Sequence, residues 1–143
     1  MLEGFLKEHK KIGLDSNIFI YFIEANPSYH HLTIKLFESI EKGRNLGICS
    51  SLSLLEVLVQ PYRRKNEELV NQFYALMTTF PNLIWKDLTL EIADLGARLR
   101  AHYSIKTPDA ILLATAIQSG ATGFIGNDLQ LKKVQEIQTL VLG

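Results

Sequence analysis

Short apolar runs alternate with longer helical stretches along the whole chain, and this alternation constrains the fold more than any other feature. The apolar runs are predicted strands, at residues 11–14, 46–50, 83–85, 123–126 and 139–142. Strands that alternate with helices form a parallel sheet covered by helices on both faces. The sequence therefore predicts an α/β fold.

The segments between the strands carry apolar residues at helical spacing. They predict helices at residues 18–24, 28–43, 51–60 and 69–80, one that Thr89 caps, and one at 109–119. Pro61 is expected to end the helix that begins at Ser51. Thr107 suits the N-cap and Pro108 the first position of the last helix, which is apolar nearly all round and should be buried. The ten residues before the first strand lie outside this pattern.

The composition narrows the class of protein. The 143 residues carry 15 basic and 15 acidic side chains and a single cysteine. We expect one domain over 1–143, with its core from about residue 11. One cysteine excludes a disulfide scaffold and any multi-cysteine zinc site. No apolar run is long enough for a membrane helix and the first residues do not resemble a signal peptide, so we expect a cytoplasmic protein without membrane contact.

Four acidic residues stand where the pattern does not require them. Asp15 follows the first strand directly, and Asp128 follows the fourth by two residues. Glu56 is the only charge in an apolar helical stretch, and Asp109 lies in the first turn of the buried helix. Ligands of parallel sheets bind beyond the carboxyl ends of the strands, so these four acids are candidates for one site.

Each acid also has an ordinary structural explanation. Asp15 suits the N-cap of the next helix, and Asp128 suits a turn in which its side chain accepts a backbone hydrogen bond. Glu56 suits an ion pair or an exposed helix stripe, and Asp109 suits the positive end of a helix dipole.

The joint placement of the four acids favours a shared site. Two carboxylates about 5 Å apart repel by roughly 3 kcal/mol at an effective dielectric constant of about 20. We therefore expect at least one carboxyl group with a raised pKa and a divalent cation that offsets the repulsion. Oxygen ligands without cysteine or clustered histidine favour Mg²⁺ or Mn²⁺.

Four segments resemble PIN-domain ribonucleases of the VapC toxin type. The resemblance covers about residues 11 to 143, and its segments are Leu14-Asp15-Ser16-Asn17, Ser53-Leu54-Leu55-Glu56-Val57, Thr107 to Ala116 and Gly126-Asn127-Asp128. It implies a PIN-like three-layer α/β/α fold with a five-stranded parallel sheet in the order 3-2-1-4-5. It also implies a catalytic and metal-binding quartet of Asp15, Glu56, Asp109 and Asp128, and Mg²⁺- or Mn²⁺-dependent endonucleolytic hydrolysis of RNA.

In this mechanism, Asp15, Asp109 and Asp128 would hold one or two ions. Glu56 would complete the metal site or accept a proton from the attacking water. Ser16, Asn17 and Asn127 are candidate supporting residues, and Asn17 would orient Asp15 by a hydrogen bond or simply begin the helix. The chain departs from the family at Gly126, where a threonine or serine is frequent, and at Leu131, where a phenylalanine is frequent.

The implied partners are RNA, a small antitoxin that inserts a chain into the acidic groove, and a second copy in a homodimer. RNA must approach past acidic groups, so basic residues should surround them. The candidates, each also suited to a solvated surface, are Arg63, Arg64, Lys65, Lys106, Lys132 and Lys133.

The main alternative is a catalytically weak PIN-like binding module that acts through protein or RNA association. The zero net charge and Gly126 keep this hypothesis open. A haloacid-dehalogenase-like phosphotransferase would need a second aspartate at position 17, where Asn17 stands. A receiver domain would need an adjacent acid pair, which the Asp15 region lacks.

Overall fold

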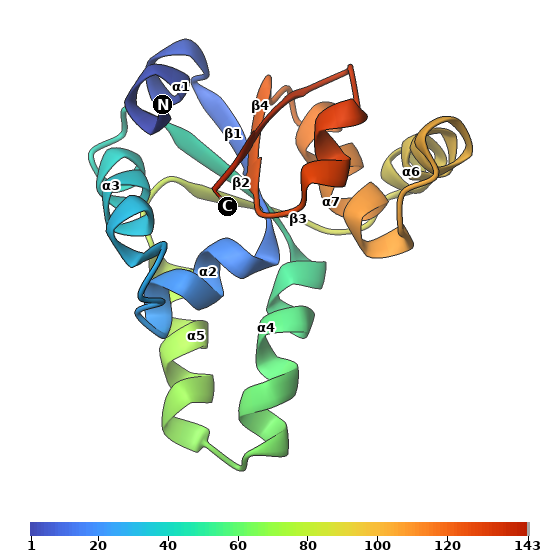
Figure 1. The fold of residues 1–143 in the computed structure, drawn as a ribbon. Helices are drawn as coiled ribbons and strands as arrows, with labels where there is room; N and C mark the ends of the chain where they lie inside the picture. The colour runs from blue at the N-terminus through green and yellow to red at the C-terminus, as the bar shows by residue number, and fades with distance from the viewer. Residues whose placement is uncertain (143) are drawn as a thin grey trace.

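The structure is a computed structural model that describes residues 1–142. At its centre lies a five-stranded, all-parallel sheet in the order β3-β2-β1-β4-β5 (Figure 1). The strands are β1 (Lys11–Leu14), β2 (Leu46–Ser50), β3 (Leu83–Lys86), β4 (Gly123–Gly126) and β5 (Gln138–Val141). The predicted fold class and strand order are confirmed, and the strand order reverses between β1 and β4.

Helices cover both faces of the sheet (Figure 1). One face carries α1 (Leu2–Glu8), α2 (Ser16–Ile23), α3 (His30–Glu41), α4 (Ser51–Arg63) and α5 (Glu67–Thr79). The other carries α6 (Leu90–Tyr103), α7 (Thr107–Gln118) and the short 3-10 helix η1 (Leu129–Lys133). Each face therefore has its own hydrophobic core.

Successive strand residues alternate between the two cores, as the pleat of a strand requires. In β4, Phe124 packs into the core of α6 and α7, and Ile125 packs into the opposite core. In β2, Ile48 packs into the core of α6 and α7, and Cys49 packs into the opposite core, where it is fully buried. Burial raises the pKa of the Cys49 thiol.

Two predicted helix boundaries are wrong. Helix α4 does not stop at Pro61 but continues to Arg63, with the proline ring buried in its last turns. The proline is tolerated there because it removes only one hydrogen bond near the helix end, while its carbonyl accepts one from the Asn66 amide at 2.9 Å. Helix α7 has Lys106, not Thr107, as its N-cap, because the Lys106 carbonyl already accepts the Ala110 amide at 2.9 Å.

Two elements were not predicted. Residues 2–8 form α1, which places Leu2 and Phe5 in the core of α2 and α3. The other unpredicted element, η1, follows β4. By contrast, Thr89 caps α6 as expected, because its hydroxyl oxygen accepts the Ile92 amide at 3.2 Å.

No helix within residues 1–142 combines the length and the apolar character needed to cross a bilayer.

Candidate active site

The four predicted acids line one cleft at the carboxyl ends of β1, β2 and β4. The cleft has a volume of about 390 Å³. Its walls come from the first turn of α2, the second turn of α4, the first turn of α7 and the segment after β4; they include Asp15, Glu56, Lys106, Asp109 and Asp128. The structure thus brings together residues that lie far apart in the sequence.

Asp15 is the most buried of the four acids, with 7% of its surface exposed. It caps α2, because its Oδ1 accepts the Ser16 amide at 2.7 Å, and its own amide donates to the Ile125 carbonyl at 3.0 Å. The pKa of Asp15 is raised to about 6. Burial is the largest cause, the bond from the Ser16 amide acts against it, and the charges of the other three acids add to the rise. The expected direction is therefore found, although burial and not repulsion is the largest cause.

Glu56 is half-buried and is held by a hydroxyl group. The Ser16 hydroxyl donates to Glu56 Oε1 at 2.6 Å and also shares a hydrogen bond with the Ser53 hydroxyl at 3.0 Å. Within residues 1–142, no lysine, arginine or histidine lies within ion-pair distance of Glu56. The structure therefore gives no support to the ion-pair explanation of Glu56.

Asp109 faces the cleft from the first turn of α7. Burial raises the pKa of its carboxyl group, the charges of Asp128 and Glu56 raise it further, and Lys106 lowers it. No hydrogen bond anchors the Asp109 side chain within the described residues, in contrast to the other three acids.

Asp128 is half-buried and caps η1. Its Oδ1 accepts the Gln130 amide at 2.9 Å, which is the turn geometry that its position after β4 suggested. Its charge raises the pKa of both Asp15 and Asp109, so the capping residue also belongs electrostatically to the cluster.

The supporting residues differ in part from the prediction. Ser16 contacts both Asp15 and Glu56, but Asn17 is exposed at the cleft wall, and within residues 1–142 no hydrogen bond joins it to Asp15. Asn127 donates from Nδ2 to the Tyr21 hydroxyl at 2.6 Å. Tyr21 was not predicted; it lies one helical turn after Asn17 on the same face of α2, and this spacing was the available signal.

The acids fit a divalent cation by their chemistry and by their shared cleft. Asp15, Glu56 and Asp128 each use one carboxylate oxygen in a hydrogen bond within the protein, which leaves Asp15 Oδ2, Glu56 Oε2 and Asp128 Oδ2 for a ligand. In the described part of the chain, however, no three such side chains converge closely enough to hold an ion as they stand. Binding would require the acidic side chains to move closer together.

Gly126 leaves room for Asp15. A Cβ atom at this position would lie 3.2 Å from Asp15 Oδ2 and 3.3 Å from Cε1 of Phe124. Both distances are shorter than ordinary contacts, so a side chain here would press on the carboxylate. The glycine that departs from the expected hydroxyl residue is thus a direct neighbour of the most buried acid.

Of the six basic residues proposed to contact RNA, only Lys106 lines the cleft. Arg63, Arg64 and Lys65 lie where α4 ends, at the tip of the α4–α5 hairpin that projects away from the sheet (Figure 1). Arg64 also lies 3.9 Å from Glu24. Lys132 and Lys133 are exposed in η1, beyond Asp128.

The sequence and the fold both match known proteins. The PIN domain family matches residues 12–137. No curated protein sequence matches the chain significantly.

Solved toxin–antitoxin structures share the fold at low sequence identity. The structure of VapBC2 from Rickettsia felis, bound to a DNA fragment from the VapBC2 promoter, is one of them. It matches with a TM-score of 0.69 and 19% identity, over 92% of this chain and 98% of that one. A toxin–antitoxin complex from Klebsiella pneumoniae matches with a TM-score of 0.68 and 18% identity, over 93% of this chain and 98% of that one. The sarcin–ricin loop cleaving toxin VapC20 from Mycobacterium tuberculosis matches with a TM-score of 0.68 and 14% identity, over 89% of this chain and 98% of that one.

Proposed function

Because this chain belongs to the PIN domain family, we propose that it is a metal-dependent endoribonuclease and the toxin of a toxin–antitoxin pair. The observation that carries the proposal is the gathering of Asp15, Glu56, Asp109 and Asp128 around one cleft. Four acidic residues around one cleft with Lys106 as the one basic residue that lines it with them destabilise a fold, so their shared position calls for a functional reason.

The geometry suggests distinct roles for these acids. Asp15, Asp109 and Asp128 would hold Mg²⁺ or Mn²⁺, which would supply positive charge beside the scissile phosphate. Glu56 Oε2 would accept a proton from the attacking water while Oε1 stays fixed by Ser16. The resulting hydroxide would form a bond to phosphorus as the bond to the leaving oxygen breaks, and the leaving oxygen would take up a proton from solvent. Lys106 would attract the RNA phosphate into the cleft.

A cleavage assay on mixed RNA tests the proposed activity. We expect cleavage with Mg²⁺ or Mn²⁺, none with a chelator, and a loss of at least about a hundredfold in Asp109→Asn. Asp94→Asn is the matched control, because Asp94 is an exposed aspartate on α6 whose only ion pair within residues 1–142 is with Arg98. RNA binding without cleavage in the wild-type protein would instead support the binding-module alternative.

The surface of α4 supports a protein partner. Leu55, Val59 and Tyr62 form an exposed stripe at helical spacing, with Leu55 61% exposed and adjacent in sequence to Glu56. Exposed apolar side chains that gather on one helix face are typical of binding surfaces. We propose that the antitoxin covers this stripe and reaches the acidic cleft beside it.

Growth experiments test the toxin role. We expect induction of the chain to arrest growth, and co-expression of a small protein encoded next to it to relieve the arrest. In the Leu55→Glu variant, growth should stay arrested even when the small protein is co-expressed. In the control variant Leu90→Glu, at an 88% exposed position on α6, co-expression should still relieve the arrest. A homodimer is a further part of the proposal, and the mass of the purified protein in solution tests it.

A further inference from the structure

A second cavity lies at the opposite edge of the sheet from the acidic cleft. Its volume is about 640 Å³, within the range of small-molecule sites. Helices α1 and α3 and the turn before β2 form its walls, and Lys10 and Arg44 lie just before the first residues of β1 and β2. It therefore shares no wall with the cleft at the carboxyl ends of the strands.

Basic side chains predominate around this cavity. Lys7, Lys10, Lys35 and Arg44 face two acids, Glu3 and Glu38. Glu38 is neutralised from outside the cavity, because Lys42 donates to it at 2.7 Å and is the main cause of its lowered pKa, to which Arg44 adds. Glu3 lies 4.0 Å from Lys35. Within residues 1–142, Lys7 has no ion pair or side-chain hydrogen bond.

Lys10 is fixed at the edge of the cavity. Its ammonium group donates to the carbonyls of Gly43 at 2.8 Å and Arg44 at 3.1 Å, which leaves one of its three protons for a ligand. The cations therefore come from both walls: Lys7 and Lys10 from α1 and its end, Lys35 and Arg44 from α3 and the turn after it.

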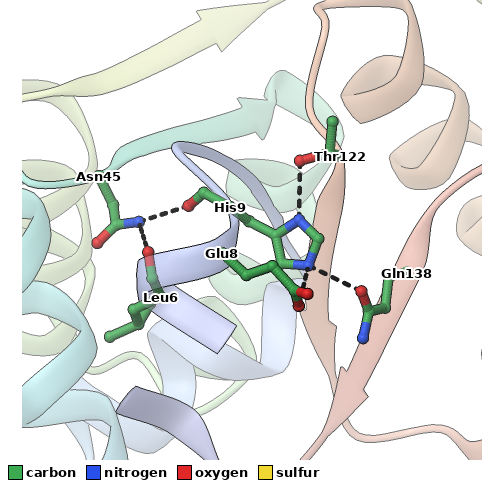
Figure 2. Close-up of polar contacts among 6 residues, drawn as sticks. All are labelled: Leu6, Glu8, His9, Asn45, Thr122 and Gln138. Carbon is green, nitrogen blue, oxygen red and sulfur yellow. Dashed lines mark hydrogen bonds and ion pairs between the residues drawn. The ribbon is translucent and has the colours of Figure 1, made fainter. Parts of the chain in front are cut away.

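Polar contacts hold α1 in place as one wall. Figure 2 shows the amide of Asn45 between the carbonyls of Leu6 and His9, at 2.8 and 2.6 Å. The His9 ring lies 2.8 Å from the Thr122 hydroxyl and 3.0 Å from Gln138 Oε1 (Figure 2). The end of α1 is thus tied through Asn45 to the turn before β2, where Asn45 Oδ1 also accepts the Ser39 hydroxyl of α3. Through His9 it is tied to Thr122, just before β4, and to Gln138 of β5, so the wall is preorganised.

We propose that this cavity binds the diphosphate group of a small molecule such as a nucleoside diphosphate. Cations on two facing walls suit an anion with two charged groups, and the volume admits more than an isolated phosphate. The acidic cleft repels the same anion in the absence of metal. The wall formed by α1 lies before residue 12, where the family match begins, and none of the residues around the cavity lines the acidic cleft. The proposal is therefore independent of the proposed nuclease activity.

Calorimetric titration of the full chain with inorganic pyrophosphate and with ADP, in the presence of a chelator, tests the proposal. We expect one site for each ligand. The double variant Lys7→Met/Arg44→Met should bind about ten- to a hundredfold more weakly, because two charged contacts are lost. Lys86→Met, an exposed lysine outside the cavity, and Asp109→Asn, in the acidic cleft, should bind as the wild type does.

The following results would overturn the proposal. These are the absence of saturable binding by the wild-type protein, equal binding by the double variant, and binding of ADP without binding of pyrophosphate. A short RNA that binds through Lys7 and Arg44 while pyrophosphate does not would equally exclude a small-molecule site. The Lys7 and Arg44 side chains are exposed, so the double variant should fold. If it does not fold, the two single variants replace it.

Discussion

The hydroxyl of Ser16 donates a 2.6 Å hydrogen bond to Glu56, across 40 positions of sequence. Ser16 directly follows Asp15, and its backbone amide holds the Asp15 carboxylate. One residue therefore fixes two acids of the cleft, one through its backbone and the other through its side chain. The bond from Ser16 to Glu56 therefore holds the first turn of α2 against the middle of α4.

Ser16→Ala tests this arrangement. The substitution keeps the backbone bond to Asp15 but removes the bond to Glu56, so we expect about 1–2 kcal/mol less free energy of unfolding. RNA cleavage should fall by about tenfold because Glu56 is no longer oriented. Urea unfolding and initial cleavage rates measure the two effects. Ser16→Thr, which retains the hydroxyl, is the control, and full activity in Ser16→Ala would contradict the role given to the bond.

The pH dependence of stability should report the burial of Asp15. Its pKa is about 6 in the fold against an ordinary 3.8, so the native state binds the proton more tightly than the unfolded chain does. The stabilising contribution is complete below the unfolded value and is lost as pH rises through about 6. Between about pH 4 and pH 7.5, the stability of the wild type relative to Asp15→Asn should therefore fall by about 2–3 kcal/mol. Unfolding in urea with a chelator measures this fall. A difference in stability between the two proteins that stays constant over this pH range would show that Asp15 is not buried.

Gly126→Ala should crowd the Asp15 carboxylate. The new Cβ would lie 3.2 Å from Asp15 Oδ2, so we expect a loss of about 1–2 kcal/mol in the free energy of unfolding and weaker Mg²⁺ binding. Gly126→Ser should bind Mg²⁺ better than Gly126→Ala if its hydroxyl donates to Oδ2. Gly4→Ala is the control, because a Cβ there meets nothing within 4 Å and alanine favours the helix. Thermal melts with and without Mg²⁺ distinguish the variants, and an unperturbed Gly126→Ala would indicate a more adaptable carboxylate.

Metal binding should stabilise the protein. At a Mg²⁺ concentration about 100 times the dissociation constant, the gain is about 2.7 kcal/mol, or a melting shift of several degrees. Glu56→Gln should stabilise the metal-free protein and reduce the shift, because it removes one repelling charge and one candidate ligand while Gln can still accept from Ser16. A metal-free Glu56→Gln that is destabilised by several kcal/mol would mean that Glu56 has a cationic partner after all.

Phe5→Ala should show that α1 is part of the core. Phe5 is 6% exposed and packs where a Cβ on Gly123 would come within 2.8 Å of its ring. We expect a loss of about 3–5 kcal/mol in the free energy of unfolding. Leu90→Ala, at an exposed position, should cost little. If Phe5→Ala is equally mild, α1 does not contribute to the core.

The strands could be predicted from the sequence, and the four acids could be marked as candidates for one site, for physical reasons. Strands buried on both faces must be apolar, so β1, β2 and β4 stand out as short runs with the observed boundaries. Charges at the ends of such strands are conspicuous because burial is costly. The convergence of the acids followed from the topology of a parallel sheet, while their catalytic roles stay a prediction.

The remaining features depend on contacts that sequence patterns do not encode. Helix α1 has only seven residues, too few for a clear period, and its position is decided by the pockets that Leu2, Phe5 and His9 fill. The bond from Ser16 to Glu56 depends on how α2 crosses α4. Of the two alternatives for Asn17, a bond to Asp15 or a place at the start of the helix, the structure has the second, and the backbone amide of Ser16 donates to Asp15 instead.

The burial of Cys49 in β2 has a practical consequence. This residue is the only cysteine of the chain and its side chain is fully enclosed, in a strand that pairs with β1 on one side and β3 on the other. A thiol reagent can reach it only when the middle of the sheet opens. The rate at which the unmodified protein is alkylated therefore measures how often these strands separate, and it does so without any label introduced by substitution.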